Sequence, residues 1–127
     1  MRFLAIYKAA ETNVPPTPEL MANMNALIDE MSRAGVLLAT EGCLPSAMGA
    51  RVRRSGTKVT VTDGPFTESK ELIAGFALLQ VSSRDEAIAW TKRFLDVAGD
   101  GESEIRQIHE LPAYPPDCAT AAAAARA

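Results

Sequence analysis

The sequence is short of the residues that build metal and redox centres. Among its 127 residues there is one histidine, His109, and two cysteines, Cys43 and Cys118, which lie far apart without a Cys-x-x-Cys motif. Structural zinc sites take their ligands from closely spaced Cys and His residues, so we expect no metal site. The chain also has no phosphate-binding glycine loop and no Ser-His-Asp arrangement. We therefore predict a protein that needs neither a metal nor a cofactor.

An excess of positive charge and a long apolar run are missing as well. Thirteen Lys and Arg residues stand against 16 Asp and Glu, which gives a net charge of −3. Nucleic acids and anionic membranes bind basic surfaces, so neither is expected as a main partner. A membrane-spanning helix needs ~20 apolar residues, and the apolar run at residues 3–7 is too short even for a signal peptide. Together with the two isolated cysteines, which fit a reducing compartment, this predicts a cytoplasmic protein.

What the sequence does have is an alternation of apolar strands and amphipathic helices. Residues 3–7 and 72–79 are apolar on both faces, which is typical of strands covered on both sides. Thr17 and Ser83 are good N-caps for two helices, and Gly35 and Gly99 end them. The remaining elements are a strand at 36–40, a hairpin from 50 to 62 with one polar face, and a last strand at 104–111.

This order predicts one α+β domain with a ferredoxin-like split βαβ fold and an inserted β-hairpin. Both helices would then cover the same face of the sheet, and the first and third main strands would be central. The other face would expose a large apolar patch to water, which a symmetric partner could cover. We therefore expect a homodimer. The domain is expected to span residues 1–111, and the Pro/Ala-rich residues 112–127 are expected to form a flexible tail.

The turn Asp63-Gly64-Pro65-Phe66, with Thr67-Glu68 and Lys70-Glu71 behind it, resembles the signature of the YCII-related family, in its DGPF branch. Further agreement comes from the segments at 34–42, 49–53, 83–90 and 104–111. The resemblance implies a ferredoxin-like fold that pairs into a dimeric α/β barrel. It also implies a link to extracytoplasmic-function sigma factors, whose genes often neighbour those of DGPF proteins. The founding branch has been proposed to be enzymatic through a histidine on the first helix, but residues 18–24 contain none.

The signature turn carries most of the candidate chemistry. Carboxylates and a lysine held close together shift one another's pKa and can transfer protons. Asp63 and Lys70 are therefore catalytic candidates, and Phe66 and Glu68 are candidates for ligand binding. The alternative is a solvated turn in which Asp63 bonds its own backbone and Phe66 anchors the loop in the core.

Four further residues complete the candidate set. Glu41 ends a strand and could form a carboxylate pair with Asp63, and His109 could act as a general base near neutral pH. Arg53 could hold an anionic ligand, and Tyr7 is a ligand-binding candidate on the first strand. The structural alternatives are a polar strand end, a half-buried strand histidine and a solvated arginine that discourages aggregation.

Two functional hypotheses follow. In the first, a small homodimeric domain binds a small organic molecule in a cleft, with metal-free acid-base catalysis as an added capability. In the second, the protein is a non-catalytic accessory or regulatory binding protein linked to extracytoplasmic-function sigma factor signalling. An enzyme needs at least two candidate side chains to converge in one pocket. The accessory protein needs an exposed apolar or charged patch outside the dimer face.

Overall fold

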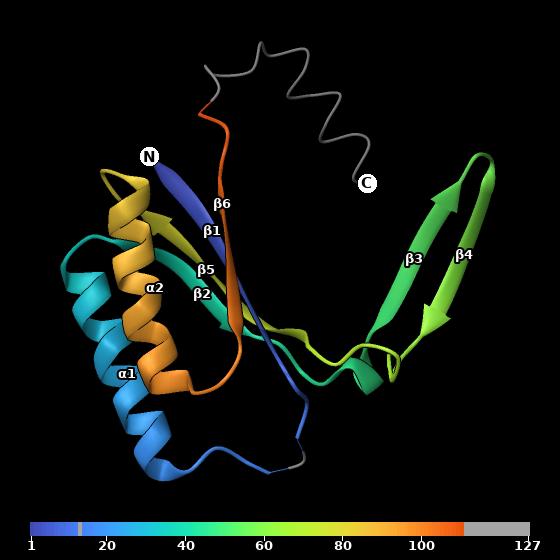
Figure 1. Cartoon of the computed structure of the whole chain (residues 1–127), viewed down its shortest axis with the longest axis horizontal. Coiled ribbons are helices and arrows are strands. Elements are labelled where there is room, and N and C mark those ends of the chain that lie inside the picture. Colours follow the sequence, from blue (N-terminus) through green and yellow to red (C-terminus); the bar gives the residue numbers. More distant parts are fainter. Residues whose placement is uncertain (13, 111–127) are drawn as a thin grey trace.

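The computed structural model describes residues 1–12 and 14–110 and shows a four-stranded sheet with two helices on one face (Figure 1). The sheet contains β1 (Arg2–Ala9), β2 (Leu37–Gly42), β5 (Leu72–Gln80) and β6 (Glu102–Gln107), in the order β2-β5-β1-β6. All of its neighbouring strands are antiparallel. The helices are α1 (Pro18–Arg33) and α2 (Arg84–Ala98).

This arrangement confirms the predicted α+β class and is compatible with a ferredoxin-like fold. The two strands predicted to be central, β1 and β5, are the inner strands of the sheet. A strand in that position has hydrogen-bonded neighbours along both edges. An apolar run without alternation is typical of such an inner strand. The Pro/Ala-rich segment 112–127 lies outside the residues that the structure describes.

The helices begin and end where their capping residues stand. Thr17 Oγ1 accepts a hydrogen bond from the Leu20 amide at 3.1 Å, and Ser83 Oγ accepts one from the Glu86 amide at 3.1 Å. Each bond satisfies one of the amides that a helix N-terminus leaves without a partner. The Glu86 carboxylate does not bond the Ser83 amide, as it would in a capping box. It accepts the Ser82 amide, at 2.9 Å. Gly35, with φ of 72°, follows the end of α1.

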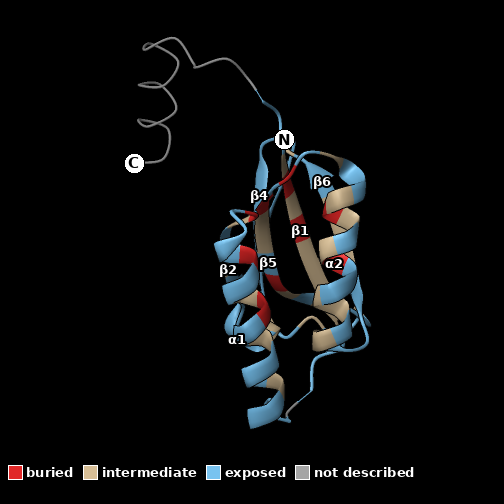
Figure 2. Ribbon diagram, turned by 90° about the vertical axis from the view of Figure 1, so that its left-hand side faces the viewer, coloured by how far each residue is buried: buried red, intermediate tan, exposed pale blue. Residues whose placement is uncertain are grey.

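The core fills only one end of the space between helices and sheet (Figure 2). Its buried members come from the first half of β1, the second half of α1, the end of β5 and the first half of α2. They are Phe3, Leu27, Met31, Val36, Leu79, Val81 and Ala87. Trp90 and Phe94, further along α2, are half-buried against this cluster.

On its two central strands the opposite face of the sheet is apolar and has no covering layer among the described residues, and β6 adds Arg106 and Glu104 beside Leu4 and Ile6. Strand alternation places Leu4 and Ile6 there, because Phe3 and Ala5 point to the helices. In the register of β1 and β5, Leu4 lies opposite Leu78 and Ile6 lies opposite Phe76. The Phe76 side chain is 38% exposed although it lies on a central strand. We call these four residues, Leu4, Ile6, Phe76 and Leu78, the outer sheet face.

The inserted hairpin stands apart from the sheet. Strands β3 (Ala50–Ser55) and β4 (Lys58–Asp63) pair only with each other as a separate two-stranded sheet, and every residue in them is exposed. Figure 1 shows the hairpin projecting from the body on the side of the sheet away from the helices, and the turned view of Figure 2 agrees. We call residues 50–63 the arm.

The last strand is shorter than the sequence predicted. Regular alternation was expected to continue through residues 104–111, but β6 ends at Gln107. The Ile108 amide still donates to the Arg2 carbonyl at 2.9 Å, and the chain then leaves the sheet edge. His109 therefore lies beyond the strand and is exposed, so the strand-histidine alternative was wrong. Leu111 lies outside the described residues.

Candidate functional site

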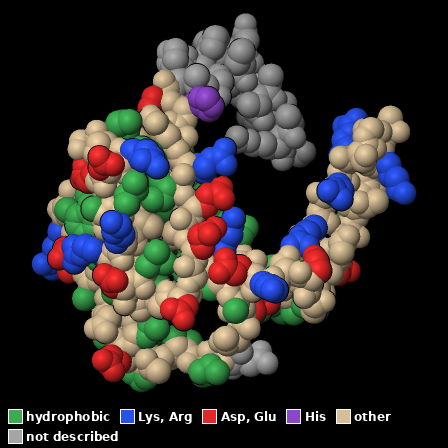
Figure 3. Space-filling model, viewed as in Figure 1, with side chains coloured by type: hydrophobic (Ala, Val, Ile, Leu, Met, Phe, Trp, Pro, Cys, Tyr) green, Lys and Arg blue, Asp and Glu red, His purple; other side chains and the backbone are tan. Residues whose placement is uncertain are grey.

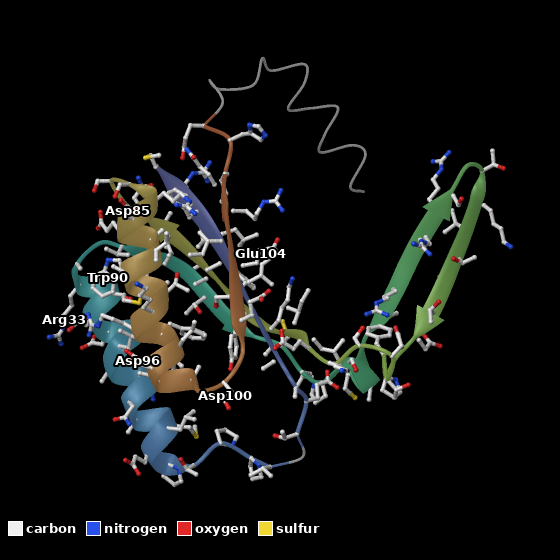
Figure 4. The ribbon with its side chains drawn as sticks, viewed as in Figure 1. Arg33, Asp85, Trp90, Asp96, Asp100 and Glu104 are labelled. Atoms are coloured by element: carbon white, nitrogen blue, oxygen red, sulfur yellow. The ribbon has the colours of Figure 1, made fainter. Side chains whose placement is uncertain are left out.

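A cavity of about 760 Å³ lies between the helices and the sheet. Its walls come from both helices and from strands β2 and β5, with further residues from β1 and β6. The cavity borders the core at Leu27, Met31 and Leu79 and extends from there toward the end of the layer that the core leaves unfilled. The apolar side chains of its lining include Leu20, Met24, Ile28, Leu37, Trp90 and Phe94. Figure 4 shows Trp90 on α2 and Asp100 just beyond that helix. The site is thus an apolar space within the domain, not a cleft among surface loops.

Tyr7 is one of the polar groups that line this cavity. Its hydroxyl donates to the Asp100 carbonyl at 2.9 Å, and its ring meets the Phe94 ring edge-on, with the centroids 5.1 Å apart. A Cβ at Gly101 would lie 2.6 Å from the Tyr7 ring, so only glycine lets the chain pass here. Burial, followed by the negative charges of Asp100 and Glu71, raises the pKa of the Tyr7 phenol. The group is therefore a neutral, oriented hydrogen-bonding partner at physiological pH.

Glu41 is the second predicted site residue in the lining. It lies on β2 opposite Phe76. The neighbouring Thr40 hydroxyl donates to the Phe76 carbonyl at 2.9 Å, which holds β2 against β5. A Cβ at Gly75 would come within 2.8 Å of the Glu41 carbonyl oxygen, so glycine permits the close approach of these strands. Residues opposite each other in an antiparallel pair share a face. The Glu41 side chain therefore lies on the outer side with Phe76, and Tyr7 supplies the phenol of the cavity.

The signature turn lies elsewhere, at the base of the arm. Asp63, Phe66, Glu68 and Lys70 are absent from the cavity lining. The Gly64 amide donates to the Gly49 carbonyl at 3.0 Å. The Phe66 amide donates to Ser46 Oγ at 3.2 Å, and Ser46 Oγ donates in turn to a Glu11 carboxylate oxygen at 2.9 Å. We call this set of contacts the arm root.

Arg51 joins the arm to the turn. Its guanidinium lies 3.8 Å from the centroid of the Phe66 ring and forms an ion pair with Glu68. It also donates to Ser69 Oγ at 3.3 Å. A backbone hydrogen bond at Glu68, followed by the Arg51 contact, lowers the pKa of the Glu68 carboxyl. Arg51 thus braces the base of the arm, while the candidate Arg53 is exposed on the same strand.

The arm root yields a first testable prediction. A Cβ at Gly64 would lie 1.7 Å from the Ser46 backbone oxygen, so Gly64→Ala must displace the turn from the segment at 46–49. We expect hydrogen-exchange protection of the residue 64 and Phe66 amides to fall by about tenfold or more, because both would lose their acceptors. Stability of the core should change little, since none of the arm-root residues belongs to its cluster.

Gly49→Ala is the matched control for that change. A Cβ at Gly49 would meet the same Ser46 oxygen at 3.5 Å, an ordinary contact, and the backbone of Gly49 is extended with φ of −114°. Protection at residues 64 and 66 should stay as in the parent chain. Equal loss in both variants would show that the turn is not held by the packing described above.

The structure brings together only part of the set that the sequence suggested. Tyr7 and Glu41 border the cavity, whereas Asp63, Lys70, His109 and Arg53 lie outside its lining. Sequence reasoning missed Trp90, Phe94 and Met24 as site residues. Side chains that pack in a core and side chains that line a cavity recur at the same helical spacing. The periodicity of the sequence therefore could not distinguish a cavity-lining residue from a core residue.

Two negative findings apply to the described part of the chain. Residues 1–12 and 14–110 contain no group of three or more Cys, His, Asp or Glu side chains placed to hold a metal ion. Within the same residues, neither helix has the length and hydrophobicity needed to cross a bilayer.

Comparison with known proteins identifies a matching domain and a similar protein. Residues 1–112 match the YCII-related domain. The chain is also 30% identical over 90 residues to a protein of Rhizobium meliloti (strain 1021) described as "Uncharacterized protein R00369". The aligned part covers 70% of this chain and 73% of that relative. The domain match extends over both helices, the sheet and the arm.

Proposed function

The chain belongs to the YCII-related family, and from this premise we propose that it is a homodimeric domain, formed by residues 1–111, that binds a mainly apolar small molecule between its helices and its sheet. The observation that supports this proposal is the cavity of about 760 Å³ with its apolar lining. Small-molecule pockets have volumes of about 300–1,000 Å³ and combine apolar walls with a few polar groups. Protein interiors are otherwise packed to the density of organic crystals, so a space of this size is best explained by an occupant.

The polar groups in the lining indicate the chemistry of the ligand. The Tyr7 phenol can accept a hydrogen bond while its own proton is given to the Asp100 carbonyl. Thr40 also lines the cavity, and its hydroxyl oxygen can accept a hydrogen bond in the same way. A ligand with an apolar body and a single donor group, such as an amine or a hydroxyl, would match both. Trp90 and Phe94 would supply flat surfaces for an aromatic or alicyclic body.

Binding without turnover is the form of the proposal that the geometry favours. Acid-base catalysis requires two groups within hydrogen-bonding reach of one substrate. Of the catalytic candidates, Glu41 alone borders the cavity of a single chain, with its side chain on the outer side, while Asp63, Lys70 and His109 lie outside it. A ligand-binding domain of this kind would also suit an accessory role beside an extracytoplasmic-function sigma factor.

The outer sheet face supports the homodimer in the proposal. Leu4, Ile6, Phe76 and Leu78 form an apolar patch on the two central strands. Apolar patches of this kind on a sheet mark interaction sites. A twofold partner that presents the same patch would bury both, because such an interface is self-complementary. Pairing of two sheets in this way would form the dimeric α/β barrel.

Binding of the neutral fluorophore N-phenyl-1-naphthylamine tests the cavity proposal. Its apolar rings and single N–H match the proposed ligand, and Trp90 is the one tryptophan of the chain. We expect saturable binding, one probe per chain, with energy transfer from Trp90 to the probe. Ala77→Phe should weaken binding by about tenfold or more, because Ala77 lines the cavity and a ring there would project into the space that the probe needs.

Ala26→Phe is the control, since Ala26 is exposed on α1 and adds the same bulk outside the cavity. It should bind the probe like the parent chain. Near-ultraviolet circular dichroism of each variant checks that binding reports a folded protein and not a molten one. Absence of saturable binding, or equal binding by Ala77→Phe, would contradict the proposal.

A further inference from the structure

We propose that the arm is an intersubunit clasp, whose apolar face packs against a second copy of this chain. This inference rests on the proposed homodimer and extends it, because the sheet pairing described above involves no residue of the arm. It arises from three properties of the arm: its two unlike faces, its charge, and its position relative to the outer sheet face.

The two faces of the arm differ sharply. In the β3–β4 register Val52 lies opposite Val61 and Arg54 lies opposite Val59, so the three valines share one face, which also carries Arg54 at the tip side and Asp63 at the base. We call it the apolar face after its valines. The exposed fractions are 71% for Val52, 64% for Val61 and 58% for Val59. The other face carries Arg51, Arg53, Lys58, Thr60 and Thr62. An isolated two-stranded hairpin is marginally stable in water, and this one leaves its apolar face without a partner among the described residues.

The arm and the rest of the chain have opposite charge. Residues 50–63 contain four basic side chains and one acidic, a net charge of +3, whereas the rest of the chain has nine basic and 15 acidic, a net charge of −6. Figure 3 shows basic side chains along the arm and acidic ones gathered on the body across the open space from it. Glu104 of β6 belongs to this acidic side (Figure 4). A second copy therefore offers the arm a surface of complementary charge.

The position of the arm selects the second copy as its occupant. The arm projects on the side of the sheet away from the helices (Figures 1 and 2). That is the side of the outer sheet face, so a copy that covers Ile6 and Phe76 stands beside the arm. The arm root fixes this direction through Arg51, Phe66 and Ser46. The arm is thus pre-organised for contact, which lowers the entropic cost of docking.

Sedimentation analysis of a matched pair of variants tests the clasp. Val61→Asp places a charge on the apolar face, and Thr60→Asp places the same charge on the opposite face of the same strand. We expect the dimer dissociation constant of Val61→Asp to rise by about tenfold or more, as for a charge placed within a packed contact. Thr60→Asp should change it by less than about threefold. Both positions are exposed within one chain, so each variant should retain the parent fold.

Photo-crosslinking supplies an independent readout. With p-benzoylphenylalanine in place of Val59 we expect covalent dimers on irradiation, and with it in place of Lys58, on the other face, we expect few. Equal dissociation constants for both aspartate variants, with no crosslink from position 59, would overturn the clasp. If Ile6→Asp separates the dimer in that case, the clasp is rejected and the pairing of the two outer sheet faces is retained. A parent chain that is monomeric throughout would overturn both the pairing and the clasp.

Discussion

Replacing Ile6 by aspartate is expected to separate the dimer, with a dissociation constant about a hundredfold higher than that of the parent chain. Ile6 lies on central strand β1 and faces away from the helices, opposite Phe76 of β5. Pairing of two outer sheet faces would bury a carboxylate at this position in each subunit, next to Glu104, which lies opposite Ile6 on β6 and already holds the nearby Lys8 and Arg106. An unpaired charge at an interface costs about 2–5 kcal/mol, and the factor of a hundred corresponds to about 2.7 kcal/mol.

Sedimentation equilibrium over a range of protein concentrations measures this effect. Ala89→Asp adds the same charge on the exposed surface of α2 and should leave the dissociation constant unchanged. Ile6→Ala provides a milder variant for the case in which aspartate disturbs the strand, and it should weaken the dimer by a smaller factor. A dimer of parental affinity in both Ile6 variants would show that the subunits associate through another surface.

Leu79→Ala is expected to lower the free energy of unfolding by about 2–5 kcal/mol. Leu79 is 1% exposed and lies on β5 between β1 and β2, against the helices. It also borders the cavity, so truncation would join the new void to existing empty space. Neighbouring side chains cannot close a space that is already open on one side, which places the expected loss in the upper part of the range.

Urea titration monitored by circular dichroism measures this loss, at one fixed protein concentration because dimer stability depends on concentration. Leu44→Ala makes the same chemical change at a side chain that is 74% exposed. It should alter stability by less than about 0.5 kcal/mol. A difference below about 1 kcal/mol between the two variants would contradict the position of the core.

Sequence reasoning succeeded where a pattern repeats over several residues. The apolar runs around Phe3–Tyr7 and Leu72–Leu79 identified the central strands, because an apolar run without alternation is typical of an inner strand. Thr17 and Ser83 identified the helix starts, because capping is a local interaction between a side chain and an amide a few residues away. Fold class and strand order follow from these elements and from the rule that chain connections stay short.

Sequence reasoning was less informative about contacts between residues that are far apart in the sequence. Asp63, Phe66, Glu68 and Lys70 were grouped because they are neighbours in sequence, and in the structure Phe66 and Glu68 of that group brace the arm. The partner that completes the brace, Arg51, is 17 residues from Glu68, and no local rule connects them. Regular alternation could not show that β6 ends at Gln107, since the end of a strand is set by the strand beside it.

The separation of the arm from the core affects how related chains can diverge. The 12 residues of β3 and β4 do not appear in the core cluster of the described chain. Mutations there therefore escape the stability loss that restricts substitutions such as Leu79→Ala. After a gene duplication, two copies could change their arms while keeping one scaffold. Each would then recognise itself and reject its sibling, so a cell could keep several such binding domains from mixing subunits.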